Sequence, residues 1–309
     1  MAAQTFILCP GQGAQVVGMG KALCESAAAA KGLFERSSQI LGFDLGKVCF
    51  EGPEDQLSKT DISQPALYVA GVASFRHAVE SGKFDAAAVT AYAGLSLGEY
   101  TALHLAGTFG FEEGLKLVAL RGKFMQEAAL ATPSGMVALI GADEAAAKKI
   151  CADAAGGQVL VPANFNAPGQ IVISGAIEAC GRAVAAAEAQ GIRAMPLKVA
   201  GAFHSPLMRP AADKMIAELA KVAFSRPGKT VYSNVTAAPH GEGDSIKKLL
   251  VEQIVSPVRW EQTMQAIASQ SASGQSASGE ARFIELSPGK TLAGLAKRIN
   301  RRIAVESLG

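Results

Sequence analysis

Apolar positions along the chain follow two different spacings. Short apolar runs bounded by glycine, proline or polar residues predict strands at residues 6–9, 86–93, 230–234 and 282–286. Helical spacing predicts the helices 19–30, 66–79, 98–106, 111–128, 211–222, 245–254, 259–269 and 292–302. Because strands alternate with helices, we expect an α/β fold in which a largely parallel sheet is covered on both faces.

The pattern changes within residues 133–199. There the predicted order is strand, helix, strand, strand, helix, strand, which is the order of a ferredoxin-like α+β unit. We therefore predict that residues 133–199 form a small subdomain inserted into a large α/β catalytic domain made of residues 1–132 and 200–309. The repetitive Ser/Gly/Ala segment at 271–279 is expected to be a flexible loop without chemistry.

A serine between two glycines follows the predicted strand at 86–93. In Gly94-Leu95-Ser96-Leu97-Gly98 a strand passes into a helix through a turn so tight that glycine is needed two residues before and two residues after the serine. Such a nucleophile elbow projects the hydroxyl beyond the carboxyl end of the strand. Ser96 is therefore a candidate nucleophile; the alternative is a serine that caps the following helix in a glycine-rich turn.

The composition restricts the classes of function. The 309 residues are 49% hydrophobic and 18% charged, which indicates a globular protein with a substantial core. A net charge of +2 does not favour a nucleic-acid partner, and no apolar run approaches the roughly 20 residues of a membrane-spanning helix. The start of the chain has no signal-peptide pattern, and the five scattered cysteines have no metal-ligand spacing. We expect a cytoplasmic protein with reduced thiols and no metal.

A serine nucleophile requires a base, and the chain has four histidines. His77 precedes the elbow strand, and His240 stands in a Pro/Gly/Glu loop that we expect to be solvated. His104 lies about 12 Å along the helix behind Ser96, too far to be the base. Elimination favours His204, which follows a predicted strand, although a structural histidine is the alternative. No acidic residue between Ser96 and His204 occupies a persuasive strand end, which favours a dyad whose imidazole is oriented by a main-chain carbonyl.

Arg121 lies on an apolar face of the helix predicted at 111–128. This helix is apolar on two faces, so we expect it to be largely buried. A buried guanidinium without an anionic partner is strongly destabilising. The partner is either an internal carboxylate, such as Glu99 or Glu127, or a carboxylate of a bound ligand.

Two polar segments are candidates for the lining of a cleft. The loop that contains Gln12 joins the first strand to a helix and offers main-chain N–H groups to an oxyanion, unless Gln12 simply occupies a turn. The segment 164–170 lies between two strands of the small subdomain. Its amides either face a cleft or merely close a hairpin.

Several segments together resemble one enzyme family. They are Gly11-Gln12-Gly13-Ala14-Gln15, Gly94-Leu95-Ser96-Leu97-Gly98-Glu99-Tyr100, Arg121-Gly122, Asn164-Phe165-Asn166-Ala167-Pro168-Gly169-Gln170, Gly201-Ala202-Phe203-His204-Ser205-Pro206-Leu207-Met208 and Ser287-Pro288-Gly289-Lys290. In colinear order, from about residue 6 to residue 302, they resemble the malonyl-CoA:acyl carrier protein transacylases, which load malonate for fatty-acid synthesis. The resemblance implies a hydrolase-like sheet domain with a ferredoxin-like insertion, in agreement with the pattern of strands and helices.

The resemblance also implies a catalytic role for five positions. Ser96 would carry malonate as an ester, and His204 would act first as general base and later as general acid. The main-chain N–H groups of Gln12 and Leu97 would form the oxyanion hole. The main-chain carbonyl of Gln253 would accept the second ring N–H of the histidine.

Substrate contacts and partners follow from the same resemblance. Arg121 would bind the free carboxylate of malonate as a bidentate pair, and Asn166 and Gln170 match positions that line the cleft. The implied partners are malonyl-CoA and acyl carrier protein. No cofactor is implied, because CoA and phosphopantetheine enter as parts of the substrates, and we expect a monomer.

The sequence departs from the family at Leu95, where histidine is common, so acyl selectivity or rate could differ. The run Ala202-Phe203-His204 resembles that of malonyl-selective acyltransferases, which implies that the bulk of Phe203 crowds an α-methyl group and favours malonyl over methylmalonyl. Basic residues near the C-terminus are candidates for carrier-protein docking or a solvated face: Lys290, Lys297, Arg298, Arg301 and Arg302. Three alternatives stay open, namely an acyltransferase of a polyketide pathway, a serine ester hydrolase, and a non-catalytic scaffold that binds carrier protein.

Overall fold

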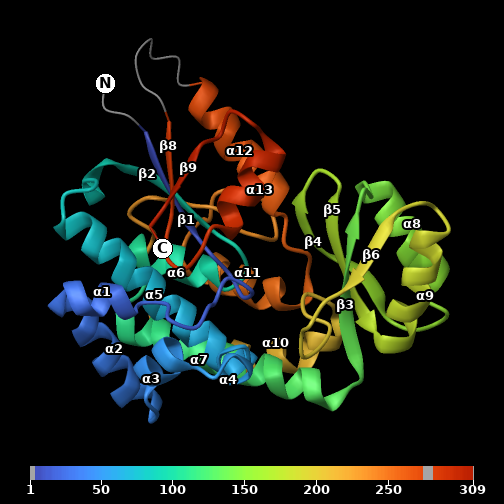
Figure 1. The fold of residues 1–309 in the computed structure, drawn as a ribbon, viewed down its shortest axis with the longest axis horizontal. Coiled ribbons are helices and arrows are strands. Elements are labelled where there is room, and N and C mark those ends of the chain that lie inside the picture. The colour runs from blue at the N-terminus through green and yellow to red at the C-terminus, as the bar shows by residue number, and fades with distance from the viewer. Residues whose placement is uncertain (1–3, 274–280, 309) are drawn as a thin grey trace.

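The computed structural model describes residues 4–273 and 281–308 and contains two separate sheets. Figure 1 shows the larger sheet with its helices on one side of the molecule and the smaller sheet on the other. The chain leaves the large part at the end of helix α7 (Phe111–Ala131) and returns to it after strand β6 (Arg193–Pro196). The predicted fold class, a parallel-sheet α/β structure with a ferredoxin-like insertion, is confirmed; the exact domain bounds stay a prediction.

The large sheet is parallel throughout. Its strands are β1 (Thr5–Cys9), β2 (Val89–Gly94), β7 (Thr230–Val231), β8 (Arg282–Glu285) and β9 (Val305–Ser307). They are ordered β7-β2-β1-β8-β9, so β1 lies at the centre. Ile7 and Cys9 of β1 face one core cluster, whereas Phe6 and Leu8 face the other. Both faces of the sheet are therefore buried, as the uninterrupted apolar run in β1 requires.

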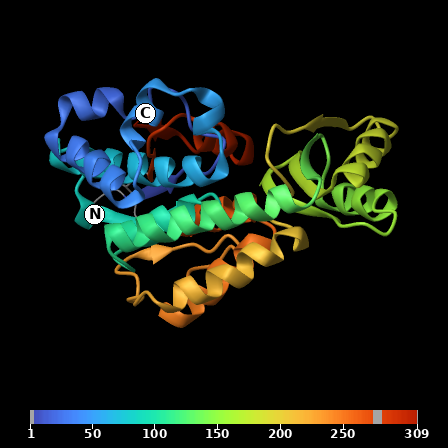
Figure 2. The same cartoon turned by 90° about the horizontal axis from the view of Figure 1, so that it is seen from below.

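Helices cover both faces of this sheet. One face carries α5 (Thr60–Glu80), α6 (Gly98–Leu105) and α7, with α10 (Arg209–Ala220) beside α7 and α11 (Gly243–Val255) beside α10. The other face carries α12 (Trp260–Ser273) and α13 (Thr291–Ile299). The short helices α1 (Lys21–Ser26), α2 (Ala28–Leu41), α3 (Leu45–Glu51) and α4 (Glu54–Leu57) pack outside α5. Figure 2 shows α7 running from beneath the large sheet to the small one, so this helix connects the two parts.

The small sheet is antiparallel and carries its helices on one face. Strands β3 (Ser134–Ile140), β4 (Leu160–Ala167), β5 (Gln170–Ala176) and β6 are ordered β4-β5-β3-β6, and α8 (Glu144–Ala154) and α9 (Ile177–Glu188) cover the outer face. Val137 and Ile173 point to these helices, whereas Met136 and Val172 join the core of the large part. The alternation of side chains thus leaves one face of the small sheet for the cleft.

Several expected elements have different limits in the structure. The helix expected at 19–30 is two helices, separated at Ala27, whose backbone is extended. Helix α5 begins at Thr60, before the expected start at residue 66, so Pro65 lies inside the helix. Strand β4 continues to Ala167, so most of the expected polar turn at 164–170 belongs to a strand pair. Strand β9 was not expected, and much of the segment 271–279 lies outside the described residues.

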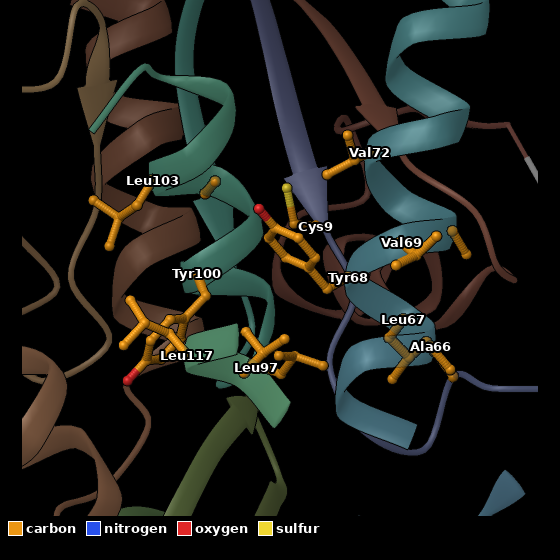
Figure 3. Close-up of a cluster of buried hydrophobic side chains, with 14 of the residues drawn as sticks. Cys9, Ala66, Leu67, Tyr68, Val69, Val72, Leu97, Tyr100, Leu103 and Leu117 are labelled. Carbon is orange, nitrogen blue, oxygen red and sulfur yellow. The ribbon is translucent and has the colours of Figure 1, made fainter. Parts of the chain in front are cut away.

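A tightly packed cluster supports the turn that carries Ser96. Figure 3 shows Leu97 and Leu103 on the side of α6, Tyr68 and Val72 on α5, and Cys9 at the end of β1. Each of these side chains is at most 1% exposed. Movement of the turn would open gaps in this cluster, at a cost of about 1 kcal/mol or more for each buried methyl group left without contacts.

Candidate active site

The turn between β2 and α6 has the geometry of a nucleophile elbow. A side chain at Gly94 would collide with the main chain of Gly98, and one at Gly98 would collide with the carbonyl of Cys9. Ser96 itself has a φ of 51°, in the left-handed region that a residue with a side chain rarely adopts. The N-cap position of α6 is occupied by Leu97, with no side-chain capping bond. The geometry therefore favours the elbow over the alternative of a helix-capping serine.

The loop after β1 lies directly against the elbow. A side chain at Gly11 would collide with the carbonyl oxygen of Leu95, whose N–H donates to the carbonyl of Cys9 at 3.0 Å. Among the described residues, no acceptor takes the main-chain N–H of Gln12 or of Leu97. These two groups are therefore available to a developing oxyanion, and their role in an oxyanion hole stays a prediction.

Ser96 and His204 form a hydrogen-bonded pair. The Oγ of Ser96 lies 2.8 Å from Nε2 of His204, and Nδ1 of His204 lies 2.8 Å from the main-chain oxygen of Gln253. Because a carbonyl only accepts, Nδ1 carries the ring proton and Nε2 is the acceptor for the serine hydroxyl. His204 also has a positive φ, 57°. Both Ser96 and His204 therefore adopt a left-handed backbone conformation that is uncommon for residues with a side chain.

His204 is a neutral base in this environment. Its exposed fraction is 4%, and burial, followed by the positive charge of Arg121, lowers its pKa from 6.5 to about 4. The carbonyl of Gln253 opposes this shift, because it accepts a hydrogen bond from the ring. At neutral pH the imidazole can therefore accept the proton of Ser96.

Arg121 is buried, and its hydrogen-bond partners among the described residues carry no charge. Its side chain is 1% exposed, and its two terminal nitrogens donate to Oε1 of Gln64 at 2.7 Å, Oε1 of Gln253 at 2.8 Å and Oγ of Ser96 at 3.0 Å. All three acceptors are uncharged. Burial lowers the pKa of Arg121 below its ordinary value, which is the electrostatic sign of a cation that lacks compensation.

Neither internal carboxylate considered for Arg121 forms a salt bridge with it. Glu127 pairs on the surface with Lys214 at 2.6 Å. Glu99 is fully buried, but between it and the guanidinium stands the amide of Gln253, which donates to Oε2 of Glu99 at 2.7 Å and accepts from Arg121. Among the described residues, no carboxylate lies within ion-pair distance of Arg121, so of the two partners considered for this guanidinium the internal carboxylate is not found.

The site lies in a cavity of about 380 Å³ between the two sheets. Residues of the large part that line it include Gln12, Gln64, Leu95, Met125, Phe203 and Leu295, and those of the small part include Met136, Asn164, Asn166, Gln170, Val172 and Lys198. Asn166 and Gln170 are thus in the cleft, as expected, with Asn166 on β4 and Gln170 at the start of β5. The mixture of apolar walls and a few polar groups is typical of a small-molecule site.

The structure corrects the expectation for His240 and adds residues that the sequence did not single out. The side chain of His240 is fully buried and its Nε2 lies 2.6 Å from Oε1 of Glu99, so it is not in a solvated loop. Asn234 accepts the N–H of Ser96 at 2.6 Å, and Gln64 contacts Arg121. Asn234 follows a strand next to the elbow strand, a signal that could have identified it.

The described residues contain neither a cluster of metal-ligating side chains nor a membrane-spanning helix. Within residues 4–273 and 281–308, no group of three or more His, Cys, Asp or Glu side chains is arranged to hold a metal ion. Over the same ranges, no helix has the length and apolar character needed to cross a membrane.

Comparison with known proteins supports an acyl-transfer site. The model of the acyl transferase domain family matches residues 5–302. The malonyl CoA-acyl carrier protein transacylase of Escherichia coli strain K12 is 43% identical over 300 residues, which cover 97% of this chain and 94% of that protein. The solved structure of the transacylase of the same name from Coxiella burnetii has a TM-score of 0.92 and 40% identity, covering 99% of this chain and 94% of that one.

A third relative is a complex with a partner. It contains a type II PKS acyl-carrier protein in complex with its malonyl-transacylase. The match has a TM-score of 0.92 and 38% identity and covers 99% of this chain and 96% of that chain. Family model, relatives and structures agree over almost the whole chain. The chain belongs to the acyl transferase domain family.

Proposed function

We propose that this enzyme transfers a malonyl group from malonyl-CoA to the phosphopantetheine thiol of acyl carrier protein, through an ester on Ser96. The observation that carries the proposal is the buried guanidinium of Arg121, 3.0 Å from the nucleophile and without an anion. An acyl group that bears its own carboxylate supplies that anion. A hydrolase of neutral esters has no use for a buried cation at this position.

In the first half-reaction, Nε2 of His204 takes the proton of Ser96 as Oγ attacks the thioester carbonyl. The N–H groups of Gln12 and Leu97 stabilise the oxyanion, and each such donor contributes about 3 kcal/mol to lowering the barrier. The tetrahedral intermediate collapses to the malonyl ester, and the protonated His204 gives its proton to the CoA thiolate as it leaves. The main-chain carbonyl of Gln253 holds the ring throughout.

The second half-reaction reverses the roles. The phosphopantetheine thiol enters the cleft that CoA has left, His204 takes its proton, and the thiolate attacks the ester carbonyl. The proton returns to Oγ of Ser96 when the C–O bond breaks. The apolar side chains that line the cavity, including Leu95, Met125 and Phe203, reduce the access of water to the ester.

The location of the basic C-terminal residues supports carrier-protein docking close to the cavity. Thr291 and Leu295 of α13 line the cavity, and the charged positions on and around this helix are exposed: Lys290, Lys297, Arg298, Arg301 and Arg302. A carrier protein with an acidic surface would be attracted to them. A type II polyketide carrier is the second candidate acceptor, because the relative in the third comparison is bound to one.

Intact-mass measurement tests the proposed function directly. Purified protein incubated with malonyl-CoA is expected to gain the mass of one malonyl group and to lose it when holo acyl carrier protein is added, with the carrier gaining the same mass. Acetyl-CoA serves as the control and should give a far smaller adduct. An adduct that water removes as fast as the carrier does would indicate a hydrolase, and no adduct would indicate a scaffold.

The pH dependence of malonyl transfer reports on His204. Only the neutral imidazole acts as base, so kcat/KM for malonyl-CoA should stay level as the pH falls through 6.5 and decline only toward the pKa of about 4. The acid limb of kcat should lie higher, because the bound malonyl carboxylate offsets the charge of Arg121 that lowers this pKa. Initial rates across the pH range measure both limbs.

If kcat/KM for malonyl-CoA instead declines with a midpoint near pH 6.5, burial and the charge of Arg121 do not lower the pKa of His204. Folding needs a parallel check by circular dichroism, because a histidine whose pKa is lowered in the folded state destabilises the protein as the pH falls below the ordinary value of 6.5.

Phe203 is expected to restrict the α-carbon of the acyl group. Its side chain is 6% exposed and lines the cavity beside the catalytic pair. Phe203→Ala should raise the use of methylmalonyl-CoA relative to malonyl-CoA by about tenfold, since one methyl group accounts for about 1–3 kcal/mol of discrimination. Competition between the two thioesters measures the ratio. An unchanged ratio would assign the selectivity to another wall of the cavity.

A further inference from the structure

A buried carboxylate lies beneath the elbow and does not line the substrate cavity. Glu99 is fully buried in the first turn of α6, and its two oxygens accept from three groups. Oε1 receives Nε2 of His240 at 2.6 Å; Oε2 receives Nε2 of Gln253 at 2.7 Å and the main-chain N–H of Asn234 at 3.0 Å. Neither Glu99 nor His240 is among the residues that line the cavity.

The carboxylate determines which way the amide of Gln253 points. A carboxylate only accepts and a guanidinium only donates, so the NH₂ end of Gln253 must face Glu99 and its oxygen must face Arg121. The same NH₂ group donates to the main-chain oxygen of Ser96 at 3.0 Å. The main chain of Gln253 holds His204. One residue thus connects the carboxylate to the nucleophile, the base and the cation.

Asn234 provides a second connection from Glu99 to the elbow. Its Oδ1 accepts the N–H of Ser96 at 2.6 Å and its Nδ2 donates to the carbonyl of Gly94 at 2.7 Å. Because the N–H of Ser96 is taken in this way, the N–H of Leu97 is the one left for an oxyanion. The main-chain N–H of Asn234 donates to Glu99, and this bond holds Asn234 where its side chain can bind the elbow.

His240 completes the environment of the carboxylate. Its side chain is fully buried, and its main-chain N–H donates to the carbonyl of Val231 at 2.7 Å, which fixes the loop after β7. Without His240, Oε1 of Glu99 would be a buried acceptor with no partner, which is unfavourable enough to make the side chain rearrange. Rearrangement of Glu99 would release both Gln253 and Asn234.

We infer that His240 and Glu99 are positioning residues, which fix the Ser96–His204 pair and Arg121 together through Gln253 and Asn234. Neither touches the substrate. The inference has two parts. The first, that the network keeps Ser96 reactive, is independent of the identity of the acyl group. The second, that the network orients Arg121 toward a carboxylate, rests on the proposed function. The two parts therefore have separate measurements.

The first measurement is the rate at which a fluorophosphonate labels Ser96, and the second is the ratio of kcat/KM for malonyl-CoA and acetyl-CoA. His240→Ala should lower each by about tenfold or more, since small displacements of catalytic groups have effects of this size. His240→Gln keeps an N–H donor for Glu99 and should recover most of both values. His77→Ala, a histidine of α5 outside this network, is the matched control and should leave both unchanged.

A stability defect alone would lower the amount of folded protein without changing the malonyl-to-acetyl ratio of the folded fraction. Folded His240→Ala with the labelling rate and ratio of the original protein would overturn the inference, as would a loss that His240→Gln does not restore. If His240→Ala does not fold, Glu99→Met replaces it, because this unbranched apolar side chain of similar length removes both acceptor oxygens and leaves Nε2 of Gln253 and the N–H of Asn234 without their partner. Unchanged labelling and selectivity in Glu99→Met would also refute the network. Normal Ser96 labelling without any malonyl transfer in the original protein would refute the proposed function instead.

Discussion

Arg121→Ala is expected to lower kcat/KM for malonyl-CoA by about 10²- to 10³-fold, because it removes two charge-assisted hydrogen bonds to the malonyl carboxylate. Transfer of acetyl from acetyl-CoA should fall much less, since an acetyl group has no carboxylate to bind. The ratio of kcat/KM for malonyl-CoA to that for acetyl-CoA should therefore fall. Initial rates of transfer of each acyl group to holo carrier protein measure this ratio.

The comparison between the two acyl groups also controls for indirect damage. Arg121 contacts Oγ of Ser96 and holds Gln64, so its removal will disturb the site to some extent for every substrate. Arg76→Ala, which changes an exposed arginine on α5, is a matched control for the loss of a guanidinium. Equal losses for malonyl and acetyl transfer would show that Arg121 does not recognise the carboxylate.

Ser96→Ala is expected to abolish the malonyl adduct and to lower transfer by about 10⁴-fold or more, as loss of a covalent nucleophile does in serine enzymes. Alanine keeps the Cβ that Ser96 already has at φ 51°, so the backbone strain of the elbow changes little and the variant should fold. Intact mass after incubation with malonyl-CoA, followed by peptide mapping, locates the adduct.

Two further variants make this experiment specific. Ser269→Ala removes an exposed hydroxyl on α12 and should retain the full adduct. His204→Ala should still form the adduct, but slowly, because the nucleophile remains and only its base is lost. A malonyl adduct on Ser96→Ala, at any residue, would show that another group carries the acyl chain.

The pattern of apolar residues predicted the sheet, the insertion and the elbow, because each depends on local sequence. Glycine at 94 and 98 and the strand before them are local signals, and the collisions that side chains there would cause explain them. The burial of Arg121 was predictable from the two apolar faces of its helix. The sequence could not predict that no described carboxylate pairs with Arg121, because the position of Glu99 relative to Arg121 depends on how α6 and α7 pack.

The misjudged residues share one cause. His240 was expected in water because proline, glycine and glutamate surround it in the sequence, yet the loop folds over the end of α6 and buries the ring against Glu99. Gln64 was not singled out, because the helix was expected to begin only at residue 66, whereas α5 begins at Thr60 and directs this side chain to Arg121. Glu99 and His240 are 141 positions apart in the chain. The residues around His240 in the sequence therefore give no indication of this partner.

The hydrogen bond between Arg121 and Ser96 has a consequence for the enzyme at rest. Oγ of Ser96 gives its proton toward His204 and accepts an N–H from Arg121, so one of its lone pairs is engaged before any substrate arrives. Under the proposed function, a malonyl carboxylate would compete for the same N–H groups and release that lone pair for attack. Substrate binding and unmasking of the nucleophile would then be a single event, and electrophiles without a carboxylate would meet a partly masked serine.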